Sequence, residues 1–346
     1  MRILHLLTSN SLSGAESVAI NIINKISSTE SVYMSPEGAI SETLKSENIR
    51  FIGMKKFSFI NVIKKIRKHN PSIIHAHDLR ASVYSVIPSL MSRSRVISHI
   101  HYNSPKMSKV SLTSLFYLFF SLFFEKVIVV SNQVKSEFIF SKILNKKIVV
   151  IPNVVDAKRI LLLSQLETNE QYDLGFVGRI TPVKDPFKFI EIVRNVKNKI
   201  PNIKAIMVGE GDVFNECSEL IKKHNLVTNV HLVGFKNNPY KYMSSTKIMV
   251  STSRFEGFGL AVVEAMILGK PVVVCNVGGL KELVKDNLNG FKCSTDEEFV
   301  DRIYELLSND SLLNEMSNYA KIESRKYTEM DRYFETVSKI YGGILK

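Results

Sequence analysis

The chain has 346 residues, 45% of them hydrophobic and 23% charged, and a chain of this length usually forms more than one hydrophobic core. Its three cysteines are widely spaced and form no CxxC pair, so the sequence indicates neither a disulfide framework nor a zinc site, and a reducing, cytoplasmic location fits best. The net charge of +13 lies entirely in residues 1–166, which hold 22 basic and 9 acidic residues, whereas residues 167–346 hold 24 of each.

Basic charge confined to one half of the chain narrows the classes of partner without choosing one. Such a field attracts nucleic acid, an anionic membrane surface or a phosphorylated acceptor, and lysines also serve solubility alone. We expect peripheral association with the anionic inner face of the cell membrane and no nucleic-acid partner. The first ten residues contain too short an apolar run for a signal-peptide core, and we interpret them as a strand that enters a loop.

The first half alternates short β-rich runs with helical patterns. Strands are predicted at 2–8, 51–54, 72–77, 95–101, 126–132 and 147–153, with helices at 17–26 and 62–69 among them. This alternation is typical of βαβ units and predicts a parallel sheet.

Residues 110–124 form an uncharged stretch of 15 residues, shorter than the roughly 20 residues that a membrane-spanning helix needs. We predict a helix that is buried behind the sheet. The alternative is partial insertion into a bilayer interface, which the flanking Lys106, Lys109 and Lys126 favour.

A polar stretch at 160–172 is interpreted as the connection to a second domain. The strands of that domain are predicted at 173–179, 203–209, 230–234, 248–253 and 271–276, and the amphipathic stretch 323–344 is predicted to be a helix that packs across the domain junction. The expected architecture is α/β, with two doubly wound, Rossmann-like domains: residues 1–166 with a helix at about 328–346, and residues 167–327. Because parallel sheets bind ligands at the carboxyl ends of their strands, we expect the two domains to face a shared cleft.

The segment 254–270 reads as a loop and helix between two strands. Gly257 and Gly259 allow close approach of a ligand to the backbone, and the helix N-terminus suits a phosphate. Glu256 in the loop and Glu264 in the helix can each accept hydrogen bonds from sugar hydroxyls, one from a ribose and one from a transferred sugar. The alternative is that both glutamates are ordinary surface residues.

Two cations follow the first strand of the second domain. Arg179 and Lys184 can neutralise a diphosphate leaving group, and the chain has no DxD-like carboxylate pair. The sequence therefore predicts no metal and no cofactor other than the substrate itself. The alternative is that the two cations form a surface salt bridge with Asp185 or a neighbour.

These motifs, VGRITPVKDP, VGEGD and FEGFGLAVVEAM followed by GKPVVV and GG, resemble the retaining glycosyltransferases of family 4, which have the GT-B fold. The resemblance covers nearly the whole chain. It implies that Glu256 contacts the donor sugar, that Glu264 contacts the ribose, and that Arg179 and Lys184 contact the diphosphate. The other donor-binding residues that it implies are Gly14, Gly178, Gly209, Gly211, Phe235, Phe258, Gly259 and Leu260. Gly278 and Gly279 match the loop after the next strand, and Ser13 stands where the N-terminal loop usually has a second glycine.

Histidines alternate at two predicted strand ends in the first half. His101 matches the histidine that contacts the donor sugar in the family, and His99 points to the same side of its strand. His75 and His77 repeat at metal-like spacing, but we interpret them as a buried pair and not as ligands. Asp78 and Arg80 are weaker candidates for acceptor contacts, and Asp78 also suits a helix N-cap.

The resemblance implies a metal-independent, retaining transfer of a sugar from a nucleotide donor, with UDP as the expected nucleotide, to a glycan or a lipid-diphosphate-linked acceptor in bacterial surface polysaccharide synthesis. Alternatives are a sugar-nucleotide epimerase of the same fold and a non-catalytic nucleotide-binding subunit. A dehydrogenase is disfavoured because no GxGxxG motif follows the first strand. The sequence leaves open which sugar, base, acceptor and linkage are used, and the oligomeric state.

Overall fold

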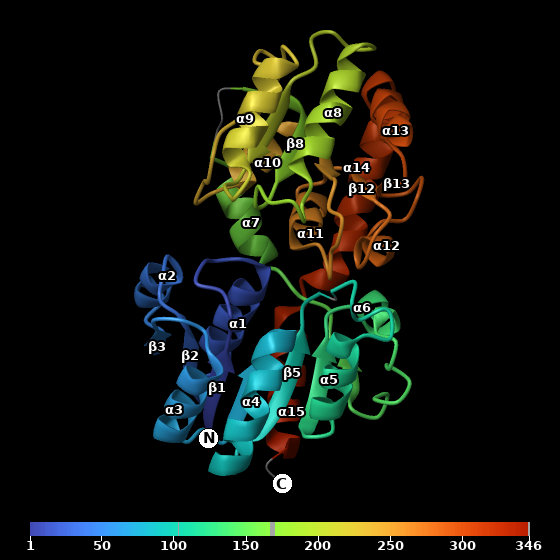
Figure 1. Ribbon diagram of the computed structural model, residues 1–346. Helices are drawn as coiled ribbons and strands as arrows, with labels where there is room; N and C mark the ends of the chain where they lie inside the picture. Colours follow the sequence, from blue (N-terminus) through green and yellow to red (C-terminus); the bar gives the residue numbers. More distant parts are fainter. Residues whose placement is uncertain (103, 167–169, 345–346) are drawn as a thin grey trace. The chain divides into compact units, whose positions relative to one another are not determined.

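The computed structural model describes residues 1–102, 104–166 and 170–344. The chain divides into two compact units, residues 1–153 with 331–346 and residues 154–330 (Figure 1). Residues 167–169 of the predicted connection and residues 345–346 of the predicted terminal helix lie outside the described part.

The first unit contains a seven-stranded parallel sheet, in the order β3-β2-β1-β4-β5-β6-β7 among the described residues. The strands are β1 (Arg2–Leu6), β2 (Glu30–Pro36), β3 (Phe51–Met54), β4 (Ile73–Ala76), β5 (Arg95–Ile100), β6 (Phe124–Val129) and β7 (Ile148–Val150). All the predicted strands are confirmed, and β2 was missed.

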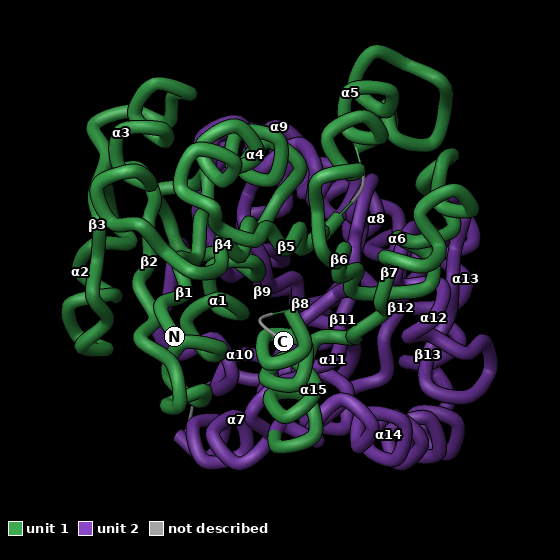
Figure 2. Tube along the Cα trace, turned by 90° about the horizontal axis from the view of Figure 1, so that it is seen from below, with its two compact units in different colours: residues 1–153, 331–346 green, residues 154–330 purple. Residues whose placement is uncertain are grey.

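Helices cover both faces of this sheet, as in other doubly wound folds. Figure 2 shows α3, α4 and α5 on one face and α1 and α15 on the other. The helices of the unit are α1 (Gly14–Lys25), α2 (Ile40–Ser46), α3 (Phe59–His69), α4 (Leu79–Ser92), α5 (Leu112–Ser121), α6 (Asn132–Glu137) and α15 (Met330–Ile344). Side chains of Ser58, Asp78 and Ser131 accept backbone hydrogen bonds at the starts of α3, α4 and α6.

The second unit contains a six-stranded parallel sheet in the order β10-β9-β8-β11-β12-β13 among the described residues. The strands are β8 (Tyr172–Val177), β9 (Ala205–Val208), β10 (Val230–Leu232), β11 (Thr246–Ser251), β12 (Val272–Cys275) and β13 (Gly290–Cys293). The helices are α7 (Ala157–Ser164), α8 (Pro186–Lys197), α9 (Phe214–Lys223), α10 (Tyr240–Ser244), α11 (Leu260–Ile267), α12 (Leu280–Leu283), α13 (Asp296–Ser308) and α14 (Asp310–Ser324), with a short 3-10 turn at Arg325–Tyr327. A continuous apolar core joins the sheet to α8, α9 and α13.

The boundary between the units differs from the prediction. It falls at 153/154 and not at 166/167, because the start of the stretch that was interpreted as a connection, residues 160–164, belongs to helix α7, which packs on α10 and α11 of the second unit. The chain returns to the first unit at Asp331, within helix α15. The hydroxyl of Tyr341, a fully buried residue of α15, lies 2.7 Å from Nδ1 of His75.

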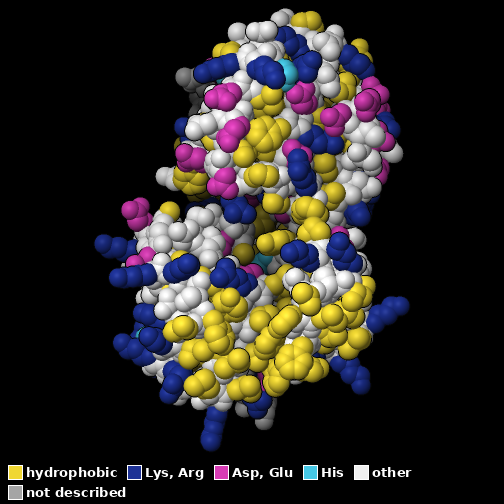
Figure 3. Space-filling model, viewed as in Figure 1, with side chains coloured by type: hydrophobic (Ala, Val, Ile, Leu, Met, Phe, Trp, Pro, Cys, Tyr) yellow, Lys and Arg dark blue, Asp and Glu magenta, His cyan; other side chains and the backbone are white. Residues whose placement is uncertain are grey.

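The helix predicted within residues 110–124 is confirmed as α5, but the predicted burial of its apolar side chains was wrong. Helix α5 buries its small and polar positions Ser114, Tyr117 and Ser121, because Tyr117 hydrogen-bonds Ser98 of β5 at 2.8 Å. Its apolar side chains face outward. Together with α4, which it contacts, it forms the apolar face seen in Figure 3, made of Ile87, Leu90, Met91, Leu112, Leu115, Phe116, Phe119, Leu122 and Phe123. None of the described helices is long and apolar enough to cross a bilayer.

Candidate active site

Two predicted residues meet at the carboxyl ends of strands β8 and β11 in the second unit. The ammonium of Lys184 donates a hydrogen bond to a carboxylate oxygen of Glu256, and the Ser253 hydroxyl lies 3.3 Å from the same oxygen. Both charged side chains are mostly buried, with 26% and 16% of their surfaces exposed. They line one pocket together with Phe176, Met249 and Gly259. The structure thus joins a cation and a carboxylate that are 72 residues apart.

The position of Glu256 is fixed through its backbone. The Gly279 N–H donates to the Glu256 carbonyl oxygen at 2.8 Å. Gly278 has a positive φ of 46°, and a Cβ atom there would lie 1.7 Å from the same carbonyl oxygen. The loop that carries Glu256 can therefore pack here only against a residue without a side chain.

A second ion pair joins the loop after β8 to the loop after β11. Arg254 Nε donates to Asp185 Oδ2 at 2.7 Å, while Oδ1 of Asp185 caps helix α8. The predicted alternative, a surface salt bridge of Arg179 and Lys184 with Asp185 or a neighbour, does not describe Arg179, and Lys184 pairs with the mostly buried Glu256 and not with Asp185. Arg179 is exposed, and its guanidinium has no ion-pair partner within the described residues. This cation is available to an anionic ligand.

Glu264 lies in helix α11, which starts after Gly259 at a φ of 104°. The Tyr240 hydroxyl donates to Glu264 Oε1 at 3.3 Å. Burial raises the pKa of Glu264 to about 7, although the Tyr240 hydrogen bond lowers it. Glu264 is therefore not the ordinary surface residue of the alternative interpretation.

Three predicted glycines lie where backbones approach one another. A Cβ at Gly209 would lie 1.8 Å from the Gly178 carbonyl oxygen, and one at Gly211 would lie 2.5 Å from the Ile180 carbonyl oxygen. Packing between the loops after β8 and β9 accounts for Gly209 and Gly211, whereas a Cβ at Gly178 would meet no atom within 4 Å. Among the other predicted donor contacts, Phe235 is exposed, Phe258 is buried against Tyr327, and Leu260 is half-buried at the start of α11.

The predicted residues of the first unit lie at the ends of its strands. His101 follows β5, and its Nε2 lies 3.2 Å from Nδ1 of His77. Burial lowers the pKa of His101 to about 3, so this imidazole is neutral. Gly14 is exposed and begins α1, where the preceding Ser13 hydroxyl bonds Glu16. The donor contacts predicted for His101 and Gly14 stay predictions.

Asp78 and Arg80 both have structural partners. Asp78 caps α4 by accepting from the Ala81 N–H, and it also accepts from the Thr8 hydroxyl, each at 2.7 Å. The guanidinium of Arg80 lies over the ring of Phe57 at 5.1 Å and also contacts Tyr84. Their proposed acceptor contacts are not needed to explain these side chains.

Sequence reasoning missed Tyr240 and Arg254 as parts of the site. Arg254 was visible as the residue that opens the loop of Glu256, but its partner Asp185 comes from a loop 69 residues earlier. No sequence pattern marked Tyr240, because only the fold brings it from helix α10 to Glu264.

Two family models match the chain, one in each half. The model described as glycosyl transferases group 1 matches residues 162–323, and the model described as glycosyltransferase family 4 matches residues 42–159.

Similar proteins agree with these matches. An uncharacterised glycosyltransferase of Methanocaldococcus jannaschii is 30% identical over 66% of this chain, which spans only 61% of that relative's length. A UDP-Gal:alpha-D-GlcNAc-diphosphoundecaprenol alpha-1,3-galactosyltransferase of Escherichia coli is 26% identical, over 75% of this chain and 72% of its own length. The crystal structure of Anabaena HepE in complex with UDP and glucose superposes with a TM-score of 0.86, at 23% identity and over 99% of both chains.

Replacing Gly278 by alanine tests the backbone constraint at Glu256. Gly278→Ala should lower the free energy of unfolding of the second unit by about 2 kcal/mol or more, because the residue must hold a positive φ and its methyl group would overlap a carbonyl oxygen. Urea unfolding followed by circular dichroism measures this. Gly342→Ala in α15 is the control, since open space surrounds that position, and it should not destabilise the protein. Equal stability of the two variants would contradict the constraint.

Proposed function

We propose that this chain catalyses a retaining, metal-independent sugar transfer. The family models and the relatives together support a glycosyltransferase of GT-B fold. The donor is a nucleotide-diphosphate sugar with UDP as the nucleotide, and it binds in the second unit. The acceptor is a glycan or a lipid-linked diphosphate in bacterial surface polysaccharide synthesis.

The observation that carries the proposal is the grouping of charges at the strand ends of the second unit. Glu256 and Lys184 are paired in a pocket, and the guanidinium of Arg179 comes from the loop after the same strand as Lys184. A carboxylate accepts hydrogen bonds from sugar hydroxyls, and fixed cations stabilise a diphosphate. The carboxylate therefore suits the sugar of a nucleotide sugar, and the cations suit its diphosphate.

The cations contribute most as the bond to the sugar breaks. Negative charge then grows on the β-phosphate, and Lys184 and Arg179 stabilise it without reorganisation. In a retaining reaction of this kind, the leaving phosphate itself takes the proton of the attacking acceptor hydroxyl. No step needs a further nucleophile from the chain.

Glu264 is the proposed ribose contact. Its carboxyl group is close to half-ionised near pH 7, and ribose hydroxyls that donate to it would favour the ionised form. The Tyr240 hydroxyl holds the carboxyl group from the other side. UDP as the nucleotide is supported by the complex of HepE, and a lipid-linked acceptor by the name of the Escherichia coli relative.

We include membrane association in the proposal, because the apolar face on α4 and α5 is too large to be explained as scattered surface residues. Exposed Lys106 and Lys109 precede α5, and exposed Arg93 ends α4. Residues 1–153 and 331–346 hold 23 basic and 10 acidic residues, whereas residues 154–330 hold 23 of each. An apolar face within an excess of positive charge matches the surface of an anionic bilayer, where a lipid-linked acceptor is found.

Transfer should not require a divalent metal at the diphosphate, because Arg179 and Lys184 supply the positive charge. Release of UDP from a UDP-sugar in the presence of acceptor should be unchanged when the assay contains EDTA. Full loss of activity in EDTA that magnesium or manganese restores would overturn this part of the proposal.

Arg179 should act mainly on the transition state. Arg179→Ala should lower kcat by on the order of 10²–10³, about 2.7–4 kcal/mol, with a much smaller rise in the donor KM. Arg179→Lys should recover little, because an ammonium cannot bridge two phosphate oxygens as a guanidinium does. Steady-state kinetics measures both, with Arg194→Ala on the exposed surface of α8 as the control. A raised KM with an intact kcat would show that Arg179 only anchors the bound donor.

Removing one aromatic ring from the apolar face should weaken membrane binding. Phe119→Glu should reduce flotation with anionic vesicles about tenfold or more, because burying a phenylalanine contributes about 1.5–3 kcal/mol. Ile322→Glu, at a similarly exposed position of α14, should have no effect. Binding of the unmodified chain should weaken with added salt. Equal flotation with neutral and anionic vesicles, or none with either, would contradict the proposed docking.

A further inference from the structure

Five of the eight histidines of the chain lie together in the first unit. They are His5 on β1, His75 and His77 on or just after β4, and His99 and His101 on or just after β5. The three strands are neighbours in the sheet, and His5 is paired with His75 in register. Since alternate residues of a strand share a face, the topology gathers all five imidazoles on one face.

The five rings form two rows of close nitrogen contacts. In one row, Nδ1 of His5 lies 3.0 Å from Nε2 of His77, whose Nδ1 lies 3.2 Å from Nε2 of His101. In the other, Nδ1 of His75 faces the Tyr341 hydroxyl, and its Nε2 lies 3.2 Å from Nδ1 of His99. His75 and His77 also stack, with ring centroids 4.2 Å apart.

Hydrogen bonding alone does not satisfy this cluster. A neutral imidazole has one N–H and one lone pair, so two bonds among three rings leave an unpaired N–H at one end of a row. His5 Nε2, His99 Nε2 and His101 Nδ1 are buried without a hydrogen-bond partner among the described residues. Each buried polar group without a partner lowers the stability of the fold by about 1–3 kcal/mol, a cost that an apolar side chain at the same place would not have. A row of imidazoles is therefore a poor way to fill a core.

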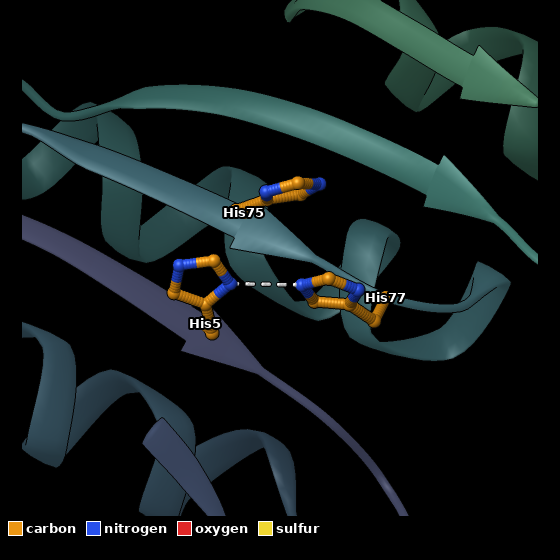
Figure 4. A group of neighbouring side chains, drawn as sticks. All are labelled: His5, His75 and His77. Atoms are coloured by element: carbon orange, nitrogen blue, oxygen red, sulfur yellow. Dashed lines mark hydrogen bonds between the residues drawn. The ribbon is translucent and has the colours of Figure 1, made fainter. Parts of the chain in front are cut away.

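We propose that His5, His75 and His77 bind one transition-metal ion of the zinc class (Figure 4). One ring nitrogen from each of these three residues lies within 4.8 Å of the other two, and all three side chains are fully buried. Two nitrogens on a tetrahedral zinc ion, each about 2.0–2.1 Å from the metal, are about 3.3 Å apart. The 3.0 Å between His5 Nδ1 and His77 Nε2 needs to open only slightly to admit the ion.

The protonation state and the outer contacts suit metal ligands. All three imidazoles are fully buried, and a neutral imidazole offers one lone pair to a metal ion. Metal-bound histidines usually donate their second ring N–H to a fixed acceptor. The Tyr341 hydroxyl can accept from His75 Nδ1, and His101 Nε2 can accept from His77 Nδ1, whereas His5 Nε2 has no such acceptor among the described residues.

The ligand set selects the kind of ion and its role. Imidazole nitrogens suit zinc, copper and nickel, whereas magnesium and calcium prefer oxygen. The ion would be structural, because it joins β1 to β4 at a fully buried position that a substrate cannot reach. Its three ligands are not residues of the proposed transferase chemistry, and His77 contacts one such residue, His101.

Metal content tests the site directly. Tag-free, full-length protein would be expressed in zinc-supplemented medium, since a buried site must fill during folding, and then dialysed against EDTA. We expect about one zinc per chain by mass spectrometry in the unmodified protein and in His231→Gln, a control in the second unit. His5→Gln and His77→Gln should retain less than about a tenth of an equivalent, provided that circular dichroism shows them folded.

Cobalt provides a measurement that needs no variant. Unmodified protein expressed with cobalt should show the visible absorption of tetrahedral cobalt with nitrogen ligands. Absence of both stoichiometric zinc and this absorption would overturn the proposal and leave the cluster as a stack of neutral imidazoles. Equal zinc in folded His5→Gln and in the unmodified protein would overturn it as well, because the ion would then be surface-bound.

Discussion

The site of the second unit depends on one backbone contact, that of the Glu256 carbonyl oxygen with Gly278 and Gly279. The loop after β11 can carry its carboxylate to Lys184 only because the loop after β12 approaches it without a side chain. The Arg254–Asp185 pair then fastens the same loop to the start of α8. Three strand ends are thus joined at one point, and packing holds the charges there.

The two units use their charge differently. The second unit is neutral overall. The charged side chains that line its pocket, Lys184 and Glu256, are paired with each other, and the Ser253 hydroxyl also contacts Glu256. The first unit carries the whole excess of positive charge, yet its interior holds neutral imidazoles whose lowered pKa values follow from burial. The interiors of both units therefore rely on specific short-range contacts, whereas the positive surface of the first unit can attract anionic partners over longer distances.

Much of the fold could be predicted from the sequence, because buried parallel strands appear as short apolar runs followed by Gly, Ser or Asn. The strand β2 was missed since its run includes Tyr33, Ser35 and Pro36. The unit boundary was misplaced since α7 is short and its last residues were assigned to the polar stretch that follows it. Helix α5 faces the opposite way from the prediction, because the hydrogen bond of Tyr117 to Ser98 sets its rotation. Periodicity locates a helix, but it cannot say which face a partner will cover.

The candidate site shows the same division. Glu256, Glu264, Arg179 and Lys184 were visible through their glycine-rich surroundings, but the Lys184–Glu256 pair depends on two loops meeting in space. Alternation placed His75 with His77 and His99 with His101. His5 carried no signal, because a single histidine in an apolar strand looks like any other residue until its neighbouring strand is known.

The first unit is discontinuous in sequence, and this has a consequence for biosynthesis. Residues 154–330 are inserted between β7 and α15, and Tyr341 reaches His75 across a sequence separation of 266 residues. On the ribosome, the second unit has all its residues available before α15 is translated. The sheet of the first unit, although made first, must wait with one face covered by α1 alone, so the earlier half of this chain is the later one to mature and the one that a holdase chaperone would protect.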